Sequence, residues 1–161
     1  TCMVEVARFF MSFTQRESCG KCIPCREGTK RMLDILEKIT EGKGTMEDLS
    51  LLYEIAETVK NTALCGLGKT APSPVLTTIS KFRDEYMAHV ERKNCPTNNC
   101  KALMNITIDK EKCIGCTACA RKCPVNAISG EKKKPHSIDT ALCIKCGECY
   151  KACKFNAVMG F

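Results

Sequence analysis

The sequence predicts an α+β protein, in which an antiparallel four-helix bundle precedes a small domain with a pseudo-twofold repeat. Two observations lead to this prediction. Apolar residues recur with helical period in four segments before residue 89, and residues 105–161 contain one cysteine pattern twice, at a spacing of 30 residues. We therefore divide the chain into a helical bundle at 1–88, a hinge or linker at 89–104 and a repeat domain at 105–161.

The four predicted helices cover 4–13, 29–39, 45–59 and 73–86. Short connections join them, which favours an antiparallel bundle. Thr45 is a good N-cap with Asp48 as its capping-box partner, and Ser73 is predicted to cap a helix that has Pro74 at its first position. The predicted apolar faces consist of Val4, Ala7, Phe10, Met11 and Phe13; Met32, Leu33, Ile35, Leu36 and Ile39; Leu49, Leu52, Ile55, Ala56 and Val59; and Val75, Leu76, Ile79, Phe82 and Tyr86.

Each half of the repeat domain has the cysteine spacing C-x2-C-x2-C-x3-C. This run is typical of 4Fe–4S ligands, and its fourth cysteine binds the cluster of the other half. Zinc sites normally use two separated pairs of ligands rather than triplets. The spacing therefore predicts two crossed ligand sets, namely Cys113, Cys116 and Cys119 with Cys153, and Cys143, Cys146 and Cys149 with Cys123.

A third cysteine triplet lies between the first two predicted helices, at Cys19, Cys22 and Cys25. It also needs a remote fourth ligand. Cys65 lies in a glycine-rich loop at 63–68, and an antiparallel bundle brings that loop to the same end as the triplet. The sequence therefore predicts a third 4Fe–4S cluster, held by these four cysteines.

The cysteines that remain are Cys2, Cys95 and Cys100, and His89 lies close to two of them in the sequence. Three cysteines and one histidine make a closed tetrahedral zinc site, which would order a hinge that has little core of its own. Cys2 is the most remote of these ligands, and the alternative is a free buried cysteine beside a flexible linker. The other histidine, His136, lies in a lysine-rich loop and is expected to be exposed.

Composition argues against three other classes of protein. The 15 cysteines are an odd number, which does not suit a secreted disulfide scaffold. The formal charge of +7 suggests nucleic acid, but each 4Fe–4S site with four thiolates carries about −2, and tryptophan is absent. No apolar run approaches the roughly 20 residues of a membrane span, and no secretory leader is visible. We therefore expect a cytoplasmic protein that binds no nucleic acid and has no membrane span.

Two parts of the chain resemble known families. Residues 105–161 resemble the bacterial two-cluster ferredoxins, with all eight cysteine ligands matched, although Lys154 replaces the usual proline. The words SCGKC-x-PCREG at 18–28 and CGLG at 65–68 resemble the iron–sulfur region of the NADH-oxidising flavoprotein subunit of respiratory complex I. NAD-linked hydrogenases and formate dehydrogenases share that region.

A ferredoxin-like domain fused to this region resembles the flavoprotein (beta) subunit of electron-bifurcating, NAD-dependent iron-only (FeFe) hydrogenases. The resemblance implies an electron relay between an upstream flavin and ferredoxin or partner-subunit clusters, with hinge motion as a gate. It also implies an FMN- and NADH-binding domain before Thr1, so the fragment alone is not expected to oxidise NADH. The implied partners are a catalytic iron–sulfur subunit, a small 2Fe–2S thioredoxin-like subunit and an external ferredoxin.

Two alternatives stay open. The chain is equally suited to the corresponding subunit of an NAD-dependent formate dehydrogenase or an NADP-reducing hydrogenase, because the distinguishing catalytic subunit is a different chain. A different class is a structural domain, in which metals order an assembly and no electrons flow. Reversible reduction of the clusters at low potential separates the relay from the structural domain.

Overall fold

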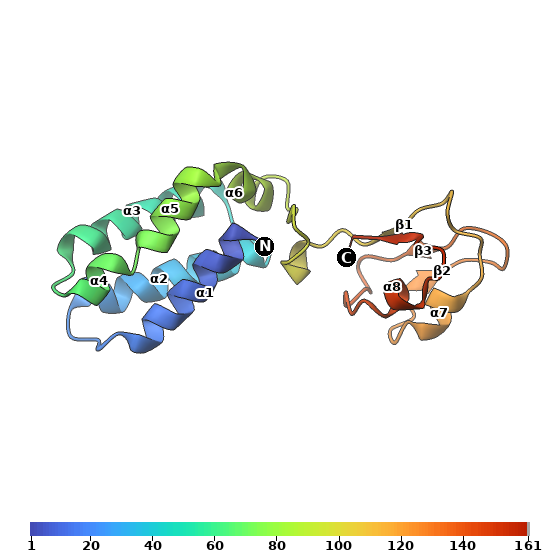
Figure 1. The fold of residues 1–161 in the computed structure, drawn as a ribbon, viewed down its shortest axis with the longest axis horizontal. Helices are drawn as coiled ribbons and strands as arrows, with labels where there is room; N and C mark the ends of the chain where they lie inside the picture. The colour runs from blue at the N-terminus through green and yellow to red at the C-terminus, as the bar shows by residue number, and fades with distance from the viewer. Residues whose placement is uncertain (161) are drawn as a thin grey trace. The chain divides into compact units, whose positions relative to one another are not determined.

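The computed structural model describes residues 1–160 and divides into two compact units, Thr1–Leu103 and Met104 onward (Figure 1). The first unit is helical, and the second contains short helices and two small sheets. No helix among the described residues combines the length and the apolar character that crossing a membrane requires.

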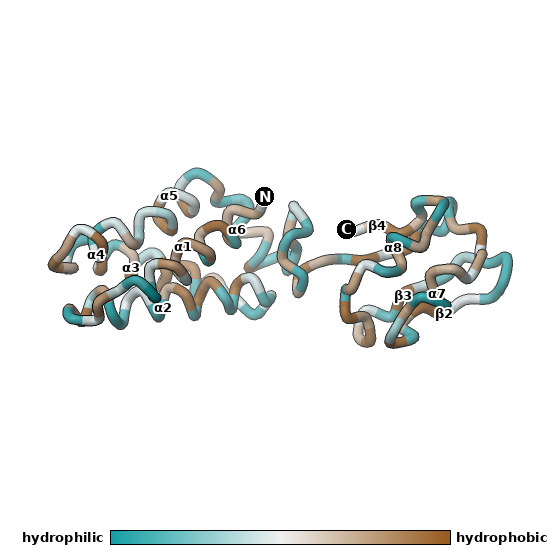
Figure 2. Tube along the Cα trace, turned by 60° about the horizontal axis from the view of Figure 1, so that its bottom comes forward, coloured by the Kyte–Doolittle hydropathy of each residue, from teal (hydrophilic) through white to brown (hydrophobic). Residues whose placement is uncertain are grey.

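The first unit contains six α-helices and a short 3-10 helix. They are α1 (Met3–Glu17), α2 (Ile23–Thr40), α3 (Met46–Thr62), α4 (Gly66–Thr70), α5 (Ser73–Lys81), α6 (Arg83–Val90) and η1 (Lys101–Leu103). The helix α2 packs against α1 and α3, and α5 packs against both α1 and α3, so these four helices surround one core. Apolar and polar residues alternate along these helices, as expected when each helix packs one face on a core (Figure 2). The largest fully buried side chains of this core include Met11, Met32, Leu36, Ile39, Leu52 and Tyr86.

The start of α3 confirms the predicted capping box. The Asp48 backbone N–H donates to Thr45 Oγ1 at 3.2 Å, and the Thr45 N–H donates to Asp48 Oδ2 at 2.8 Å. Lys38, near the end of α2, forms an ion pair with Asp48 at 2.8 Å. Partial burial works to raise the pKa of Asp48, but the bonds from Lys38 and Thr45 outweigh it and hold the pKa below its ordinary value. The box therefore also links α2 to α3.

The predicted fourth helix is wrong in one respect, because the chain breaks at Phe82 into α5 and α6. Phe82 has a non-helical backbone (φ −126°, ψ 39°) and a side chain that is 39% exposed, so it does not belong to the core face. The break lets α6 turn so that Tyr86 is buried, with its hydroxyl 2.8 Å from Thr78 Oγ1. The N-cap of α5 is Pro72 rather than the predicted Ser73.

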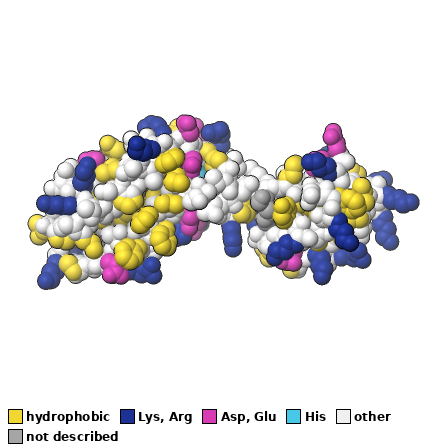
Figure 3. Space-filling model, in the orientation of Figure 1, with side chains coloured by type: hydrophobic (Ala, Val, Ile, Leu, Met, Phe, Trp, Pro, Cys, Tyr) yellow, Lys and Arg dark blue, Asp and Glu magenta, His cyan; other side chains and the backbone are white. Residues whose placement is uncertain are grey.

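Aromatic residues of α1 also depart from the prediction. Phe10 is 44% exposed and Phe13 is 52% exposed, whereas Val4, Ala7 and Met11 are fully buried. The buried positions follow the spacing i, i+3, i+7, which leaves the phenylalanines outside that stripe. They contribute to the hydrophobic side chains that remain on the surface of the unit (Figure 3).

The described residues of the second unit, 104–160, form two antiparallel two-stranded sheets and two short helices. Its elements are β1 (Thr107–Ile108), α7 (Ala118–Lys122), β2 (Ile128–Ser129), β3 (Ser137–Ile138), α8 (Glu148–Ala152) and β4 (Val158–Met159). The strand β1 pairs with β4, which comes from the other half of the unit, and β2 pairs with β3. The Asp109 N–H donates to the Ala157 carbonyl at 2.7 Å, and the Asp139 N–H donates to the Ala127 carbonyl at the same distance. The two halves therefore repeat one set of contacts 30 residues apart in the sequence.

Candidate metal centres

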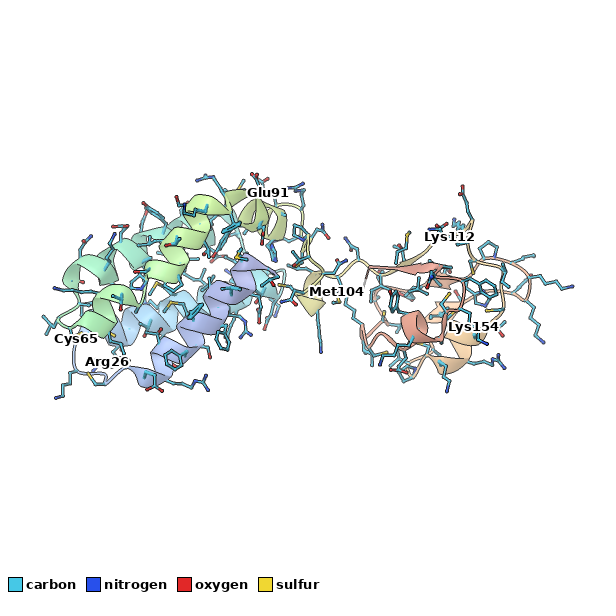
Figure 4. The ribbon with its side chains drawn as sticks, viewed as in Figure 1. Arg26, Cys65, Glu91, Met104, Lys112 and Lys154 are labelled. Atoms are coloured by element: carbon cyan, nitrogen blue, oxygen red, sulfur yellow. The ribbon has the colours of Figure 1, made fainter. Side chains whose placement is uncertain are left out.

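Four cysteines meet at one end of the first unit. Cys19, Cys22 and Cys25 lie on the α1–α2 connection and the first turn of α2, and Cys65 is the N-cap residue of α4. All four line one hollow. Figure 4 labels Cys65 and Arg26 at this end of the unit. A backbone hydrogen bond from Leu64 lowers the pKa of the Cys22 thiol, so the two loops already touch.

The elements around this hollow differ from the prediction in two ways. The helix α2 starts at Ile23 rather than at 29, with Pro24 in its first turn, so that Cys25 is helical and buried. The predicted loop at 63–68 is partly helical, because α4 starts directly after Cys65. A Cβ atom at Gly68 would lie 2.7 Å from Ala63 Cβ and 3.3 Å from Cys25 Cβ, so glycine permits the close approach of α4 to the cysteine triplet.

Each hollow in the second unit is lined by three cysteines from one half and one from the other. The first is lined by Cys113, Cys116, Cys119 and Cys153. The second is lined by Cys123, Cys143, Cys146 and Cys149. The structure thus brings together the crossed sets of cysteines rather than the four cysteines of one run.

Backbone N–H groups point at several of these sulfur atoms. Ala127 donates to Cys123 Sγ at 3.3 Å and Ala157 donates to Cys153 Sγ at 3.4 Å, which are corresponding bonds in the two halves. Such bonds fix the orientation of a ligating sulfur and stabilise its thiolate form.

The chemistry of these hollows favours a cationic metal core. Burial raises the pKa of Cys119 and of Cys149, and the charge of neighbouring thiolates raises both further. Four sulfur ligands packed this closely are therefore costly to ionise unless positive charge lies between them. The residues present fit 4Fe–4S clusters, because thiolates surround a space and backbone donors face the sulfurs.

A fourth group of donor atoms lies within the first unit. The ligand atoms of Cys2, His89, Cys95 and Cys100 all lie within 4.8 Å of one another, and all four residues are buried. His89 Nε2 is 3.3 Å from Cys2 Sγ and 3.4 Å from Cys100 Sγ. His89 Nδ1 is 2.7 Å from the Glu85 carbonyl oxygen. A carbonyl oxygen only accepts, so Nδ1 carries a hydrogen, and Nε2 is the ring nitrogen that faces the sulfurs.

The pKa values of Cys2, His89 and Cys100 are shifted because these side chains share protons and negative charge. Hydrogen bonding from Cys100 lowers the pKa of Cys2 to about 4, although burial opposes the shift. Burial works to lower the pKa of His89, but the bonds to Cys2 and to the Glu85 carbonyl outweigh it and raise the pKa to about 9. The bond to Cys2 and burial raise the pKa of Cys100. Three sulfurs and one imidazole in this arrangement are compatible with a metal site.

His136 is not exposed, contrary to the prediction. It is only 2% exposed, and it lines the hollow that contains Cys113 and Cys153. Its Nδ1 donates to the Lys134 carbonyl at 3.2 Å, while Nε2 has no hydrogen-bond partner among the described residues. The lysine-rich loop folds back over the cysteine loop, where the Lys133 N–H donates to the Gly115 carbonyl at 3.1 Å, and this buries the ring.

Sequence reasoning also missed Ser18, whose Oγ lies 3.3 Å from Cys25 Sγ. The serine stands directly before the cysteine triplet, but no spacing rule connects it to a cysteine seven residues later.

Each of the two units matches a different family of known proteins. The family model described as NADH-ubiquinone oxidoreductase-F iron-sulfur binding region matches residues 5–89, and the 4Fe-4S binding domain model matches 106–129 and 136–159. The NADP-reducing hydrogenase subunit HndC of Solidesulfovibrio fructosivorans is 56% identical over 135 residues, which is 84% of this chain and 28% of that protein. A subunit of the NADH-quinone oxidoreductase of Mycobacterium tuberculosis is 46% identical over 96 residues, which is 60% of this chain and 22% of that protein.

A solved structure has a similar fold. A chain in the crystal structure of an NAD+-reducing [NiFe]-hydrogenase in the H2-reduced state matches with a TM-score of 0.55 and 35% identity, over 56% of this chain and 16% of that chain. The present chain spans less than a third of the length of each of these relatives. It carries 4Fe-4S binding domains at 106–129 and 136–159. Because the match at 5–89 covers more than half of the 161 residues, the chain belongs to the family of the NADH-ubiquinone oxidoreductase-F iron-sulfur binding region.

Proposed function

We propose that this chain is the electron-relay part of an NAD(P)-linked oxidoreductase, and that it holds three 4Fe–4S clusters and one zinc ion. The observation that carries the proposal is that the cysteines form three separate groups of four, each of which lines its own hollow. Such clusters accept and donate single electrons. The chain's own residues would hold them in place and orient the ligating sulfurs.

The ligands proposed for the three clusters are the three groups of four described above. They are Cys19, Cys22, Cys25 and Cys65; Cys113, Cys116, Cys119 and Cys153; and Cys143, Cys146, Cys149 and Cys123. Crossed ligation and the contacts repeated 30 residues apart support a pseudo-twofold ferredoxin-like domain. A four-helix bundle is supported by the packing of α2 and of α5 against both α1 and α3. The helices α4 and α6 are additional to this bundle.

We assign zinc to Cys2, His89, Cys95 and Cys100. A Cys3His donor set suits a closed tetrahedral zinc site, and the Nδ1 bond of His89 to a backbone carbonyl fixes the ring in the orientation that a ligating histidine needs. The site would join the start of α1 to α6 and to the segment that follows α6. It would therefore order 89–100 against the bundle and leave the end of the 89–104 linker as the hinge.

The relatives favour a hydrogenase complex as the setting. One relative is a subunit of an NADP-reducing hydrogenase, and the similar solved structure is an NAD+-reducing [NiFe]-hydrogenase. A bifurcating FeFe hydrogenase is our preferred setting, with an upstream flavin domain, a catalytic iron–sulfur subunit, a 2Fe–2S thioredoxin-like subunit and ferredoxin as partners. Motion of the second unit about 89–104 would then gate the choice of acceptor. The alternative is the corresponding subunit of an NAD-dependent formate dehydrogenase or of an NADP-reducing hydrogenase, and the relative from Solidesulfovibrio fructosivorans favours the latter.

Anaerobic metal analysis with EPR of the dithionite-reduced chain tests the proposal. Three cubane sites and one tetrahedral site require about twelve irons and one zinc per chain. The EPR spectrum should contain signals of reduced 4Fe–4S clusters that disappear on reoxidation. Zinc in all four sites, or clusters that dithionite does not reduce, would favour the purely structural role and contradict the relay.

A further inference from the structure

We propose that the Ser18 hydroxyl donates a hydrogen bond to the ligating sulfur of Cys25 and so raises the reduction potential of the cluster in the first unit. The inference rests on the proposed function, because it requires a 4Fe–4S cluster in the hollow lined by Cys19, Cys22, Cys25 and Cys65. Ser18 binds no metal itself, and its role is to position a hydrogen and to stabilise negative charge on the sulfur.

The geometry defines the direction of this bond. Ser18 Oγ lies 3.3 Å from Cys25 Sγ. A sulfur that binds iron is a thiolate and carries no hydrogen, so only the hydroxyl can donate. Cys25 is 4% exposed, so water does not compete strongly at this sulfur. A hydrogen bond to a buried charged acceptor is stronger than one in water.

The loop around Ser18 holds the hydroxyl in this orientation. Ser18 is the C-cap residue of α1, and its oxygen accepts a hydrogen bond from the Gly20 N–H at 3.3 Å. Gly20 has a φ of +70°, a conformation that favours glycine. Arg26 Nη1 donates to the Gly20 carbonyl at 3.2 Å and closes the loop from the other side. Because one lone pair of Oγ is occupied, its hydrogen is left to point at Cys25.

The direction of the expected shift in reduction potential follows from the negative charge that the cluster gains on reduction. Reduction adds one electron, and hydrogen bonds to the sulfurs favour the more negative reduced state. The sulfur bonds described in the second unit, such as that from Ala127 to Cys123, come from backbone N–H groups, which substitution of a side chain does not remove. Ser18 offers the same kind of bond from a side chain, so its contribution can be removed alone.

The test is a potentiometric EPR titration of the full chain, in which the other two clusters serve as internal references. Ser18→Ala should shift the potential of one cluster to a more negative value and leave the others unchanged, while Ser18→Thr, which keeps the hydroxyl, should restore it. The matched control is Ser50→Ala. It removes a hydroxyl of the same unit that bonds to the Met46 carbonyl at 3.2 Å on α3.

Each outcome decides the inference. An unchanged potential in Ser18→Ala, with the iron content intact, overturns it and leaves the proposed function standing. If Ser18→Ala loses iron, the pair Ser18→Thr and Ser18→Val decides, since these side chains share a shape and differ in the hydroxyl. A more negative potential in Ser18→Val than in Ser18→Thr supports the inference, whereas equal potentials, or a cluster retained only with threonine, contradict a role in tuning. A chain whose iron content does not fall on Cys19→Ala substitution would instead contradict the proposed function itself.

Discussion

His89 Nδ1 lies 2.7 Å from the Glu85 carbonyl oxygen, one turn earlier on α6, and this single bond determines which ring nitrogen faces the cysteine sulfurs. With a hydrogen fixed on Nδ1, Nε2 is the nitrogen that faces the space shared by Cys2 and Cys100 and that can bind a metal once it has lost its proton. The backbone of α6 therefore orients His89 for metal binding, and substitution of His89 tests this role.

Replacing His89 should remove zinc. In His89→Ala we expect the zinc content to fall from about one per chain to near zero, because a closed tetrahedral site needs all four ligands. The buried thiolates then lose their partner, which costs on the order of 3–5 kcal/mol in the free energy of unfolding of the first unit. Metal analysis and thermal unfolding measure both effects.

The matched control is His136→Ala, which changes the only other histidine. It should leave the zinc content unchanged, since His136 belongs to the second unit. Full zinc occupancy in His89→Ala would show that the imidazole is not a ligand.

Zinc binding to the metal-free chain should release protons and weaken on acidification. The pKa of His89 is raised to about 9 and that of Cys100 is also raised, so both hold protons at neutral pH that zinc must displace. The apparent affinity should therefore rise as the pH rises toward about 9. Calorimetry in buffers of different ionisation enthalpy counts the protons, and an affinity independent of pH between 6 and 9 would contradict this assignment.

Crossed ligation predicts which cysteine substitutions act together. The single variants Cys113→Ala and Cys153→Ala, and the double variant, should each reduce iron from about twelve to about eight per chain, because they damage one cluster. Combining Cys153→Ala with Cys143→Ala should instead reduce it to about four. If the Cys113/Cys153 double variant kept only about four irons and the Cys143/Cys153 double variant kept about eight, each run of four cysteines would hold its own cluster.

The close approach of α4 to Cys25 should be sensitive to one added methyl group. In Gly68→Ala the new Cβ would lie 2.7 Å from Ala63 Cβ, so α4 must shift away from the triplet, and we expect partial loss of the iron held by Cys65. Gly66→Ala in the same helix is the control, because nothing lies within 4 Å of its Cβ position. Equal iron contents in the two variants would show that this contact does not position the fourth ligand.

Local signals in the sequence predicted local structure well. The capping box at Thr45 and the buried stripe of α3 depend on neighbouring residues, and both are present. The break at Phe82 was missed because Phe82 and Tyr86 share one helical stripe in the sequence. In the structure the two separate, because Phe82 is 39% exposed while Tyr86 is fully buried against Thr78.

The same distinction applies to the candidate sites. Cysteine spacing predicts ligand sets because it reflects the geometry of a cluster, and the cysteines of each proposed set line one hollow. Cys65 has no such spacing, and only the antiparallel bundle pointed to it. Ser18 and His136 carry no such pattern. Ser18 approaches Cys25 only because the loop after α1 turns at Gly20, and His136 is buried only because a basic loop folds over Gly115.

Coulometric titration of the anaerobic chain measures the central claim most directly. Three clusters that each take one electron predict a reversible uptake of about three electrons per chain, with the iron content unchanged through repeated cycles. A chain that takes up no electrons reversibly, while still holding its metals, would not be a relay.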